Sequence, residues 1–157
     1  MIRFAEPEDV TAIVGLVHEL ATYERAADKV QLTPERLQAA LFGASPAAFC
    51  HVAEVDGEVV GMALWFVNFS TWLGVHGVYL EDLYVRPEQR RAGIGRALLE
   101  TLARVCVDRG YGRLEWAVLD WNEPAIAFYQ SIGAVAQDEW TVHRVSGPAL
   151  RALAGSP

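Results

Sequence analysis

The sequence predicts a single α/β domain built on a mixed sheet, with its elements in the order βααβββαβαβ. Three observations support this prediction: two helical patterns follow a short first strand, an Asp-Gly pair joins two β-rich runs, and later strands alternate with helices that end at glycine. With 157 residues, of which 52% are hydrophobic, the chain can bury one core without disulfides. It contains no repeat, low-complexity segment or linker, so we expect one domain over residues 1–157.

The first part of the chain combines one strand with two helices. Residues 2–4 form a short strand, and Pro7 opens a helix in which apolar residues recur at helical spacing. These apolar residues are Val10, Ile13, Val14, Val17, Leu20 and Ala21. A second helix is expected over residues 35–42, because Thr33 can cap it and Pro34 is tolerated at the first helical position.

The middle of the chain is rich in strand-forming residues. Residues 49–55 and 58–69 are joined by Asp56-Gly57, a strong hairpin signal, so we expect these two strands to be antiparallel. Residues 77–85 form a further strand.

The last part of the chain alternates helices with strands. Residues 93–109 form a long amphipathic helix that ends at Gly110, and residues 122–131 form a shorter helix. Strands are expected at residues 114–119 and, as a last strand or pair of strands, at residues 134–145.

Composition limits the classes of partner. A net charge of −7 argues against nucleic acid as a partner and favours cationic small molecules. The longest apolar stretch, residues 59–69, is far shorter than the about 20 residues that a membrane span needs. Cys50 and Cys106 belong to no paired-cysteine framework and no signal peptide is evident, which indicates core thiols. We therefore expect a cytoplasmic protein that binds neither nucleic acid nor a membrane.

The segment from Arg90 to Gly95, RRAGIG, lies directly between a predicted strand and a predicted helix. Gly93 and Gly95 lack Cβ atoms, so the backbone can approach a bound group, and the start of the helix presents unpaired N–H groups and the positive end of its dipole. An anionic ligand is expected here, and a pyrophosphate fits best.

Two other phosphate-binding motifs fit the sequence less well. A Walker P-loop requires Gly-Lys-Ser/Thr, which is absent, so nucleotide hydrolysis is disfavoured. A dinucleotide fold would use an acidic residue about twenty positions on, where Glu115 lies, but Leu98 occupies the third small-residue position of that motif. Too few residues also remain for a doubly wound sheet.

Four segments resemble one known family. These are ELATYE (residues 19–24), FSTWLGVHGVYLEDLYV (69–85), RRAGIG (90–95) and WNEPAIAFYQSIGA (121–134). They are similar, in order and spacing, to the diamine (spermidine/spermine) N-acetyltransferase branch of the GNAT superfamily. The resemblance covers nearly the whole chain. It implies the GNAT fold, which has a mostly antiparallel central sheet with helices on both faces, and it implies acetyl-CoA as cosubstrate and a homodimer.

The resemblance also implies a set of cofactor-binding residues. Backbone groups of Leu83–Val85 would hold the pantetheine arm, and amides from Arg91–Arg96 would receive the pyrophosphate. Arg90 or Arg91 would pair with phosphate, the alternative being an exposed surface position, and Asn122 would contact CoA, the alternative being a simple helix cap. The full set is Leu83, Tyr84, Val85, Arg90, Arg91, Ala92, Gly93, Ile94, Gly95, Arg96, Asn122 and Ala125.

Two residues are expected to be catalytic. Tyr129 lies about two helical turns after Asn122 on the same face, and the resemblance makes its hydroxyl the acid that protonates the departing thiolate; its alternative is a core tyrosine. Glu81 interrupts an apolar strand, with Asp82 expected on the opposite face. The resemblance makes Glu81 the group that holds the ammonium of the acceptor and relays its proton through water, the alternative being an ion pair with a neighbouring arginine.

The acceptor site is less well defined. The resemblance assigns substrate-binding roles to Tyr23, Glu24, Glu81, Glu115, Trp116 and Asp138. The chain departs from the branch by an apparent one-residue deletion before Trp140 and by an acid at Glu115, so the acceptor could be a polyamine, a diamine or a thialysine-like amino acid. The four histidines lack metal-ligand spacing, so no metal is expected.

The predicted function is direct transfer of an acetyl group from acetyl-CoA to a primary amine within a ternary complex. Two alternatives stay open at this point: an N-acetyltransferase acting on proteins or peptides, and a non-catalytic acyl-CoA-binding sensor.

Overall fold

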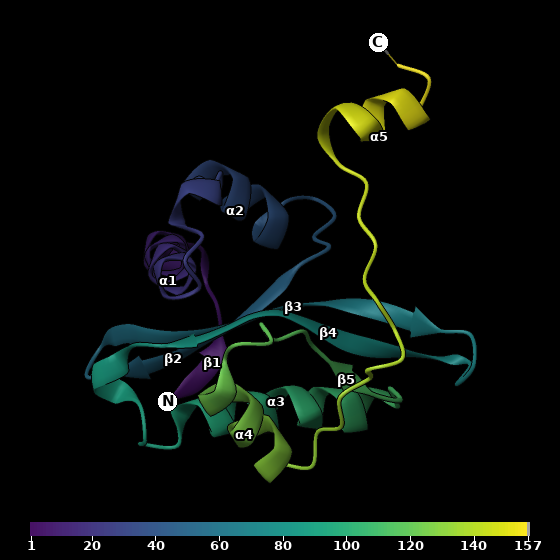
Figure 1. The fold of residues 1–157 in the computed structure, drawn as a ribbon. Coiled ribbons are helices and arrows are strands. Elements are labelled where there is room, and N and C mark those ends of the chain that lie inside the picture. The colour runs from purple at the N-terminus through teal and green to yellow at the C-terminus, as the bar shows by residue number, and fades with distance from the viewer. Residues whose placement is uncertain (157) are drawn as a thin grey trace. The chain divides into compact units, whose positions relative to one another are not determined.

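The computed structural model describes residues 1–156 (Figure 1). The chain divides into two compact units, the first spanning Met1–Leu119 and the second beginning at Asp120. The first unit contains a five-stranded sheet and its covering helices, and the second contains two helices and the segment between them.

The sheet of the first unit is mixed and mostly antiparallel, as predicted. Its strands follow one another in space as they do in sequence, and each of the first three pairs antiparallel to the next, whereas β5 is parallel to β4. The strands are β1 (Ile2–Phe4), β2 (Phe49–Val55), β3 (Glu58–Ser70), β4 (Val75–Val85) and β5 (Leu114–Glu115). The predicted hairpin is confirmed, since Asp56 and Gly57 have φ of 51° and 80°, the left-handed values that a tight two-residue turn requires.

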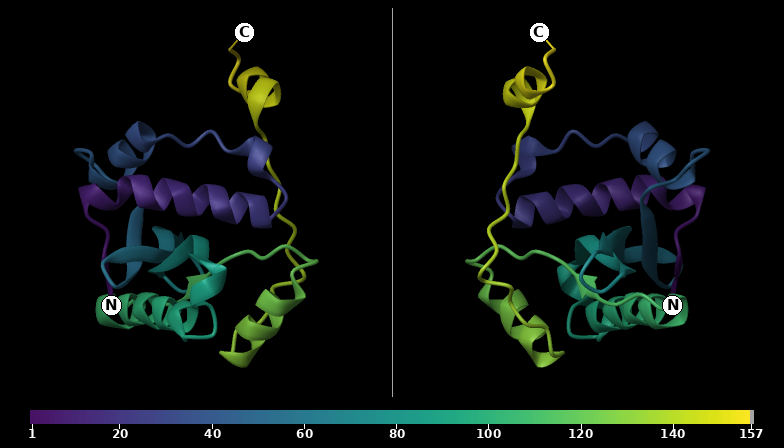
Figure 2. Two further views of the ribbon diagram at one scale, coloured as in Figure 1. Left: turned by 90° about the vertical axis from the view of Figure 1, so that its left-hand side faces the viewer. Right: turned by 90° about the vertical axis from the view of Figure 1, so that its right-hand side faces the viewer.

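Helices cover both faces of this sheet, which confirms the predicted layering (Figures 1 and 2). α1 (Val10–Tyr23) and α2 (Pro34–Phe42) lie on one face, and α3 (Ile94–Arg109) lies on the other. The predicted cap of α2 forms, because the hydroxyl of Thr33 accepts a hydrogen bond from the amide of Arg36 at 3.2 Å. On the α1 face the core joins helix residues to strand residues such as Val52, Met62 and Tyr84.

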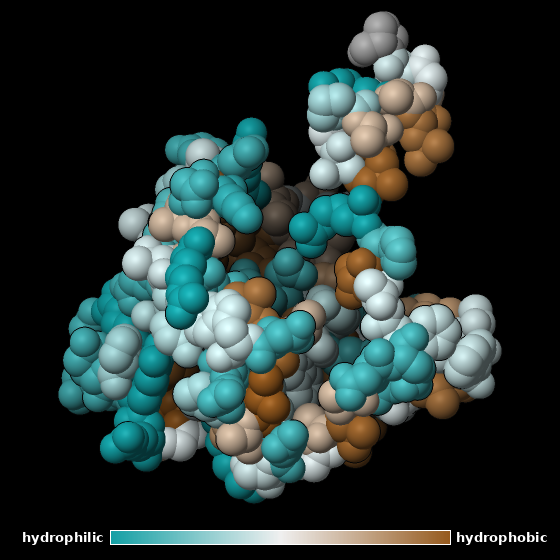
Figure 3. All heavy atoms as spheres, viewed as in Figure 1, coloured by the Kyte–Doolittle hydropathy of each residue, from teal (hydrophilic) through white to brown (hydrophobic). Residues whose placement is uncertain are grey.

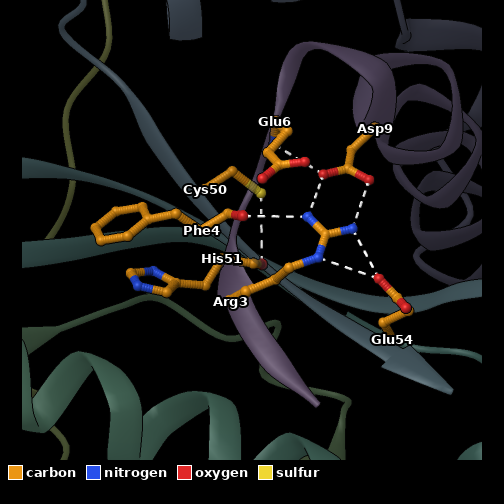
Figure 4. Close-up of polar contacts among 7 residues, drawn as sticks. All are labelled: Arg3, Phe4, Glu6, Asp9, Cys50, His51 and Glu54. Atoms are coloured by element: carbon orange, nitrogen blue, oxygen red, sulfur yellow. Dashed lines mark hydrogen bonds and ion pairs between the residues drawn. The ribbon is translucent and has the colours of Figure 1, made fainter. Parts of the chain in front are cut away.

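One charged network links β1, β2 and the start of α1 (Figure 4). Arg3 of β1 donates to both carboxylate oxygens of Asp9, at 2.6 and 3.0 Å, and to Glu54 of β2 at 2.8 Å. The amide of Glu6 donates to the same Asp9 carboxylate at 2.8 Å. The hydrogen bonds from Arg3 lower the pKa of the buried Asp9, so its carboxylate stays ionised and joins β1, β2 and the start of α1.

The second unit contains α4 (Glu123–Ser131) and α5 (Gly147–Leu153). The strand or strand pair predicted at residues 134–145 is wrong, because in the described chain these residues belong to no strand. A strand needs a hydrogen-bonding neighbour, and apolar β-branched residues alone do not provide one. The helix α5 was not predicted, although Ser146 and Pro148 are a usual start signal.

The strand predicted at residues 114–119 is also shorter than expected. Only Leu114 and Glu115 pair with β4, opposite Val78 and Tyr79.

Candidate active site

The edge of β4 becomes free part of the way along the strand. β4 and β5 pair only at Val78 with Leu114 and at Tyr79 with Glu115, whereas β3 accompanies β4 as far as Val85. Within the described residues, the stretch from Leu80 to Val85 therefore has a strand neighbour on one side only. Backbone N–H and C=O groups along such an edge can pair with an extended ligand, as they would with another strand.

The predicted cradle follows directly after β4. A short 3-10 helix, η3 (Pro87–Gln89), leads into a turn where Arg91 and Gly93 have φ of 67° and 78°. Gly93 then starts α3 without any side-chain cap. The first N–H groups of this 16-residue helix have no acceptor within the helix itself.

The space over this turn is open. A Cβ atom placed on Gly93 would meet nothing within 4 Å, and one on Gly95 would meet only a methyl group of Val85 at 3.9 Å. An anionic group can thus approach the helix start closely, where the N–H groups and the helix dipole favour negative charge. The geometry fits the predicted pyrophosphate cradle.

A β-bulge in β4 sets the position of Glu81. Leu64 of β3 pairs with Asp82 and the next residue, Trp65, pairs with Leu80, so Glu81 is an extra residue with no partner on β3. A bulge of this kind bends the strand and changes the direction of its side chains. The expectation that Glu81 and Asp82 occupy opposite faces assumed strict alternation, and the bulge interrupts that alternation.

Three carboxylates interact around this bulge. The pKa of Asp82 is raised to about 6, first by burial and then by the negative charges of Glu81 and Glu24. Glu24, the residue directly after α1, has its own pKa raised by burial. The negative charges of the two predicted acceptor carboxylates, Glu24 and Glu81, thus both act on Asp82, which the sequence analysis had assigned to the opposite face of the strand from Glu81.

Two predicted acceptor residues, Glu115 and Trp116, lie at the end of the β4–β5 ladder and just after it. Glu115 forms an ion pair with Arg113 at 2.9 Å and accepts a hydrogen bond from Asn68 at 3.4 Å. Its charge is thus partly neutralised by a local arginine. Trp116 comes next in the chain and is half-buried.

The remaining predicted residues lie in the second unit. The side-chain oxygen of Asn122 accepts a hydrogen bond from the amide of Ala125 at 3.4 Å, so Asn122 does cap α4. Tyr129 lies on the same helix, and Asp138 is exposed in the segment between α4 and α5.

Residues 1–156 contain no helix that is both long and apolar enough to cross a membrane. They also contain no group of three or more His, Cys, Asp or Glu side chains that could hold a metal ion.

Comparison with known proteins agrees with this arrangement. Residues 14–134 match the model of the Acetyltransferase (GNAT) family. The chain is 42% identical to the thialysine N-epsilon-acetyltransferase of Bos taurus, over 99% of this chain and 97% of that protein. It is 32% identical to the L-ornithine N5-acetyltransferase of Arabidopsis thaliana, over 97% of this chain and 86% of that protein.

Solved structures show the same fold. An integron cassette protein from the mobile metagenome of V. cholerae aligns with a TM-score of 0.83 and 28% identity, over 99% of this chain and 98% of that one. An aminoglycoside acetyltransferase from a soil metagenomic sample aligns with a TM-score of 0.76 at 20% identity, over 94% and 95% of the two chains, and shares the fold. The family match, the full-length relatives and the cradle at the start of α3 lead to one conclusion: this chain is an acetyltransferase of the GNAT family.

Proposed function

We propose that this enzyme transfers an acetyl group from acetyl-CoA to a primary amine of a small cationic acceptor, directly and within a ternary complex. The observation that supports this best is that β4 combines three features. It has an edge free of β5, it leads into the cradle at Gly93, and it contains the bulge that holds Glu81 beside Asp82.

The residues present fit acetyl-CoA. The open helix start at Gly93–Arg96 suits the pyrophosphate, and the free edge at Leu83–Val85 suits the amides of an extended pantetheine arm. Asn122 and Ala125 would contact CoA from α4. When bound, acetyl-CoA supplies the acetyl group as an activated thioester.

The acidic group around the bulge fits an amine acceptor. A primary amine with a reference pKa near ~10.4 is protonated at neutral pH, so it is attracted by carboxylates but must lose a proton before it can attack. Glu24 and Glu81 would hold the ammonium, together with Tyr23 and Trp116. Asp82, whose pKa is raised to about 6, is better matched than an ordinary aspartate to accept a proton near neutrality, directly or through water.

Tyr129 completes the proposed mechanism. Its hydroxyl would protonate the CoA sulfur as the thioester breaks, while a β4 amide would stabilise the negative charge that develops on the carbonyl oxygen. No acetylated form of the protein takes part, because the amine attacks the thioester directly.

The acceptor class follows from charge and from the relatives. The full-length relatives are named for thialysine and for ornithine, which are small amino acids with a side-chain amine. The human spermidine/spermine N(1)-acetyltransferase-like protein 1 matches 98% of this chain, and the match covers 23% of that protein. We therefore place thialysine-like amino acids and diamines ahead of polyamines, and all of these ahead of peptides.

A release assay for the CoA thiol, run with thialysine, ornithine, spermidine and a peptide with a free N-terminus, tests this proposal. We expect turnover with at least one of the three small amines and little with the peptide. Turnover with the peptide alone would favour a protein acetyltransferase, and tight acetyl-CoA binding without turnover on any amine would favour a sensor.

The same proposal extends to assembly and location. Val135 and Val142, in the segment between α4 and α5, are 79% and 84% exposed, and apolar side chains also gather on α5 (Figure 3). A homodimer would cover such residues. Light scattering should then give twice the chain mass of 17.3 kDa, and a monomer at micromolar concentration would contradict it. Use of acetyl-CoA and the free thiols of Cys50 and Cys106 support a cytoplasmic location.

A further inference from the structure

Arg90, the first residue of the cradle motif, makes three contacts with the protein itself. Its Nε donates a hydrogen bond to the carbonyl oxygen of Val85 at 2.9 Å. Its guanidinium carbon lies 5.3 Å from the centre of the Tyr23 ring and 5.5 Å from the centre of the Tyr84 ring. Both distances are within the range of cation–π attraction, so the planar group lies against two aromatic faces.

Tyr84 and Tyr23 belong to different elements. Tyr84 is 7% exposed in β4 and belongs to the core that packs against α1. Tyr23 is the last residue of α1 and is 39% exposed. Arg90 therefore links a rigid strand residue to the more accessible end of a helix.

A second arginine holds the same helix from the same connection. Arg86, just after β4, donates to Glu19 at 3.2 Å and also pairs with Glu58. Glu19 and Tyr23 are one helical turn apart and so lie on one face of α1. The connection between β4 and α3 thus contacts the last turns of α1 twice, through Arg86 with Glu19 and through Arg90 with Tyr23.

The end of α1 is also where the acceptor site begins. Glu24 directly follows Tyr23, and its charge contributes to the raised pKa of Asp82. After it, Arg25 has φ of 60°, a left-handed conformation that is strained for a residue with a side chain. Such a turn keeps its shape only when neighbouring contacts hold it.

We propose that Arg90 is a positioning residue for the acceptor side of the site, holding Tyr23 and hence Glu24 in place, and that it is not chiefly a phosphate ligand. Its Nε is already used by Val85, and its guanidinium lies near two aromatic rings. The inference rests on the proposed function, because it assigns Glu24 to amine binding. It extends that function by linking the cradle motif to the choice of acceptor.

The test replaces Arg90 with alanine and measures the KM of the amine acceptor and the Kd of acetyl-CoA separately. We expect the KM of the amine acceptor to rise by about tenfold, a typical coupling between two sites, while the Kd of acetyl-CoA stays within about threefold. Arg90→Lys keeps the positive charge but cannot make the same planar contacts, so it should restore acceptor KM only in part. Tyr23→Leu should raise acceptor KM too, and the double variant should be less impaired than the product of the two single effects.

Arg109→Ala provides the matched control. Arg109 also lies over two aromatic rings, 5.7 Å from Trp65 and 5.9 Å from Tyr111, but at the far end of α3 from the cradle. Its loss should leave both acceptor KM and acetyl-CoA Kd unchanged.

Hydrogen exchange gives a readout that does not depend on activity. In the ligand-free protein, Arg90→Ala should speed amide exchange at the end of α1, where Glu24 donates to Leu20 at 2.9 Å and Ala26 donates to Ala21 at 2.8 Å. Unchanged exchange there, unchanged acceptor KM, or an acetyl-CoA Kd weakened as much as acceptor KM would each overturn the inference. If the wild type acetylated no amine, the proposed function would fail, and the exchange rates alone would decide whether Arg90 holds Tyr23.

Discussion

Tyr79 of β4 lies opposite Glu115 of β5, and this pair is the last one between the two strands. Up to this pair the strands form a parallel ladder, and beyond it β4 continues to Val85 beside β3 alone. The bulge at Glu81 and the free edge of Leu83–Val85 both follow within a few residues. The short β5 therefore leaves the edge of β4 open at the place that we propose for the acyl donor and the amine.

Gly93→Ala should weaken acetyl-CoA binding by at least about tenfold, because a methyl group would enter the open space over the cradle and the turn would resist its φ of 78°. Isothermal titration calorimetry measures this. Gly110→Ala is the matched control, since Gly110 ends the same helix with φ of 68° and also has open space around it. Both variants should lose about 1 kcal/mol of stability, but only Gly93→Ala should lose affinity. Equal affinity in the two variants would remove the cradle assignment.

Glu24→Gln should move the acidic limb of the pH profile to lower pH. The negative charge of Glu24 helps to raise the pKa of Asp82 to about 6, so its removal lets that pKa fall toward the ordinary value. A base must be deprotonated to act, so kcat/KM for the amine should rise with pH through about 6 in the wild type and at lower pH in the variant.

Asp82→Asn tests whether deprotonation of Asp82 is the source of the acidic limb of the pH profile. It should abolish the limb near pH 6, whereas a limb that persists unchanged would show that Asp82 is not the group observed. Folding gives an independent check. Because the pKa of Asp82 is raised in the folded state, its contribution to the free energy of unfolding falls as the pH rises from the ordinary aspartate value to about 6. Asp82→Asn should therefore be more stable than the wild type above pH 6 but not at pH 4.

Tyr129→Phe should lower kcat by about 100-fold or more, because general acid catalysis is worth that much, while acetyl-CoA Kd stays the same. Single-turnover kinetics with the best amine acceptor measure the chemical step directly. Tyr111→Phe, which alters a tyrosine that packs near His76 and Arg109, should keep full activity. A Tyr129→Phe enzyme as fast as wild type would exclude the acid role.

Asp9→Asn should destabilise the fold at pH 7 by about 3 kcal/mol, because it breaks a largely buried ion pair with Arg3. The pKa of Asp9 is lowered in the folded state, so its contribution is present above the unfolded value near ~3.9 and is lost as pH falls below it. Urea unfolding should therefore show a difference in the free energy of unfolding between variant and wild type that is smaller at pH 3 than at pH 7. Asp108→Asn, at an exposed position on α3, should have the same free energy of unfolding as the wild type at either pH.

Much of the first unit could be predicted because its signals are local. Asp56-Gly57 determines a turn, Thr33 and Pro34 determine a helix start, and Gly93 marks the start of α3 after a strand. Each of these depends on a few neighbouring residues.

The features that could not be predicted depend on partners far away in the sequence. The bulge at Glu81 exists because Leu64 pairs with Asp82 and Trp65 pairs with Leu80, a shift in register. The role of Arg90 depends on the ring of Tyr23, which is distant in the chain. Residues 134–145 have the composition of a strand, but composition does not supply the neighbour that a strand requires.

Direct transfer of the acetyl group from acetyl-CoA to the amine is tested best by following the acetyl group itself. The enzyme is mixed with acetyl-CoA and either thialysine or ornithine, both substrates are varied in initial-rate measurements, and the products and the protein are weighed by mass spectrometry. We predict an amine carrying one acetyl group, a protein of unchanged mass, and intersecting double-reciprocal lines. An acetylated protein with parallel lines, or no acetylated amine from any small acceptor, would contradict direct transfer at the β4 site.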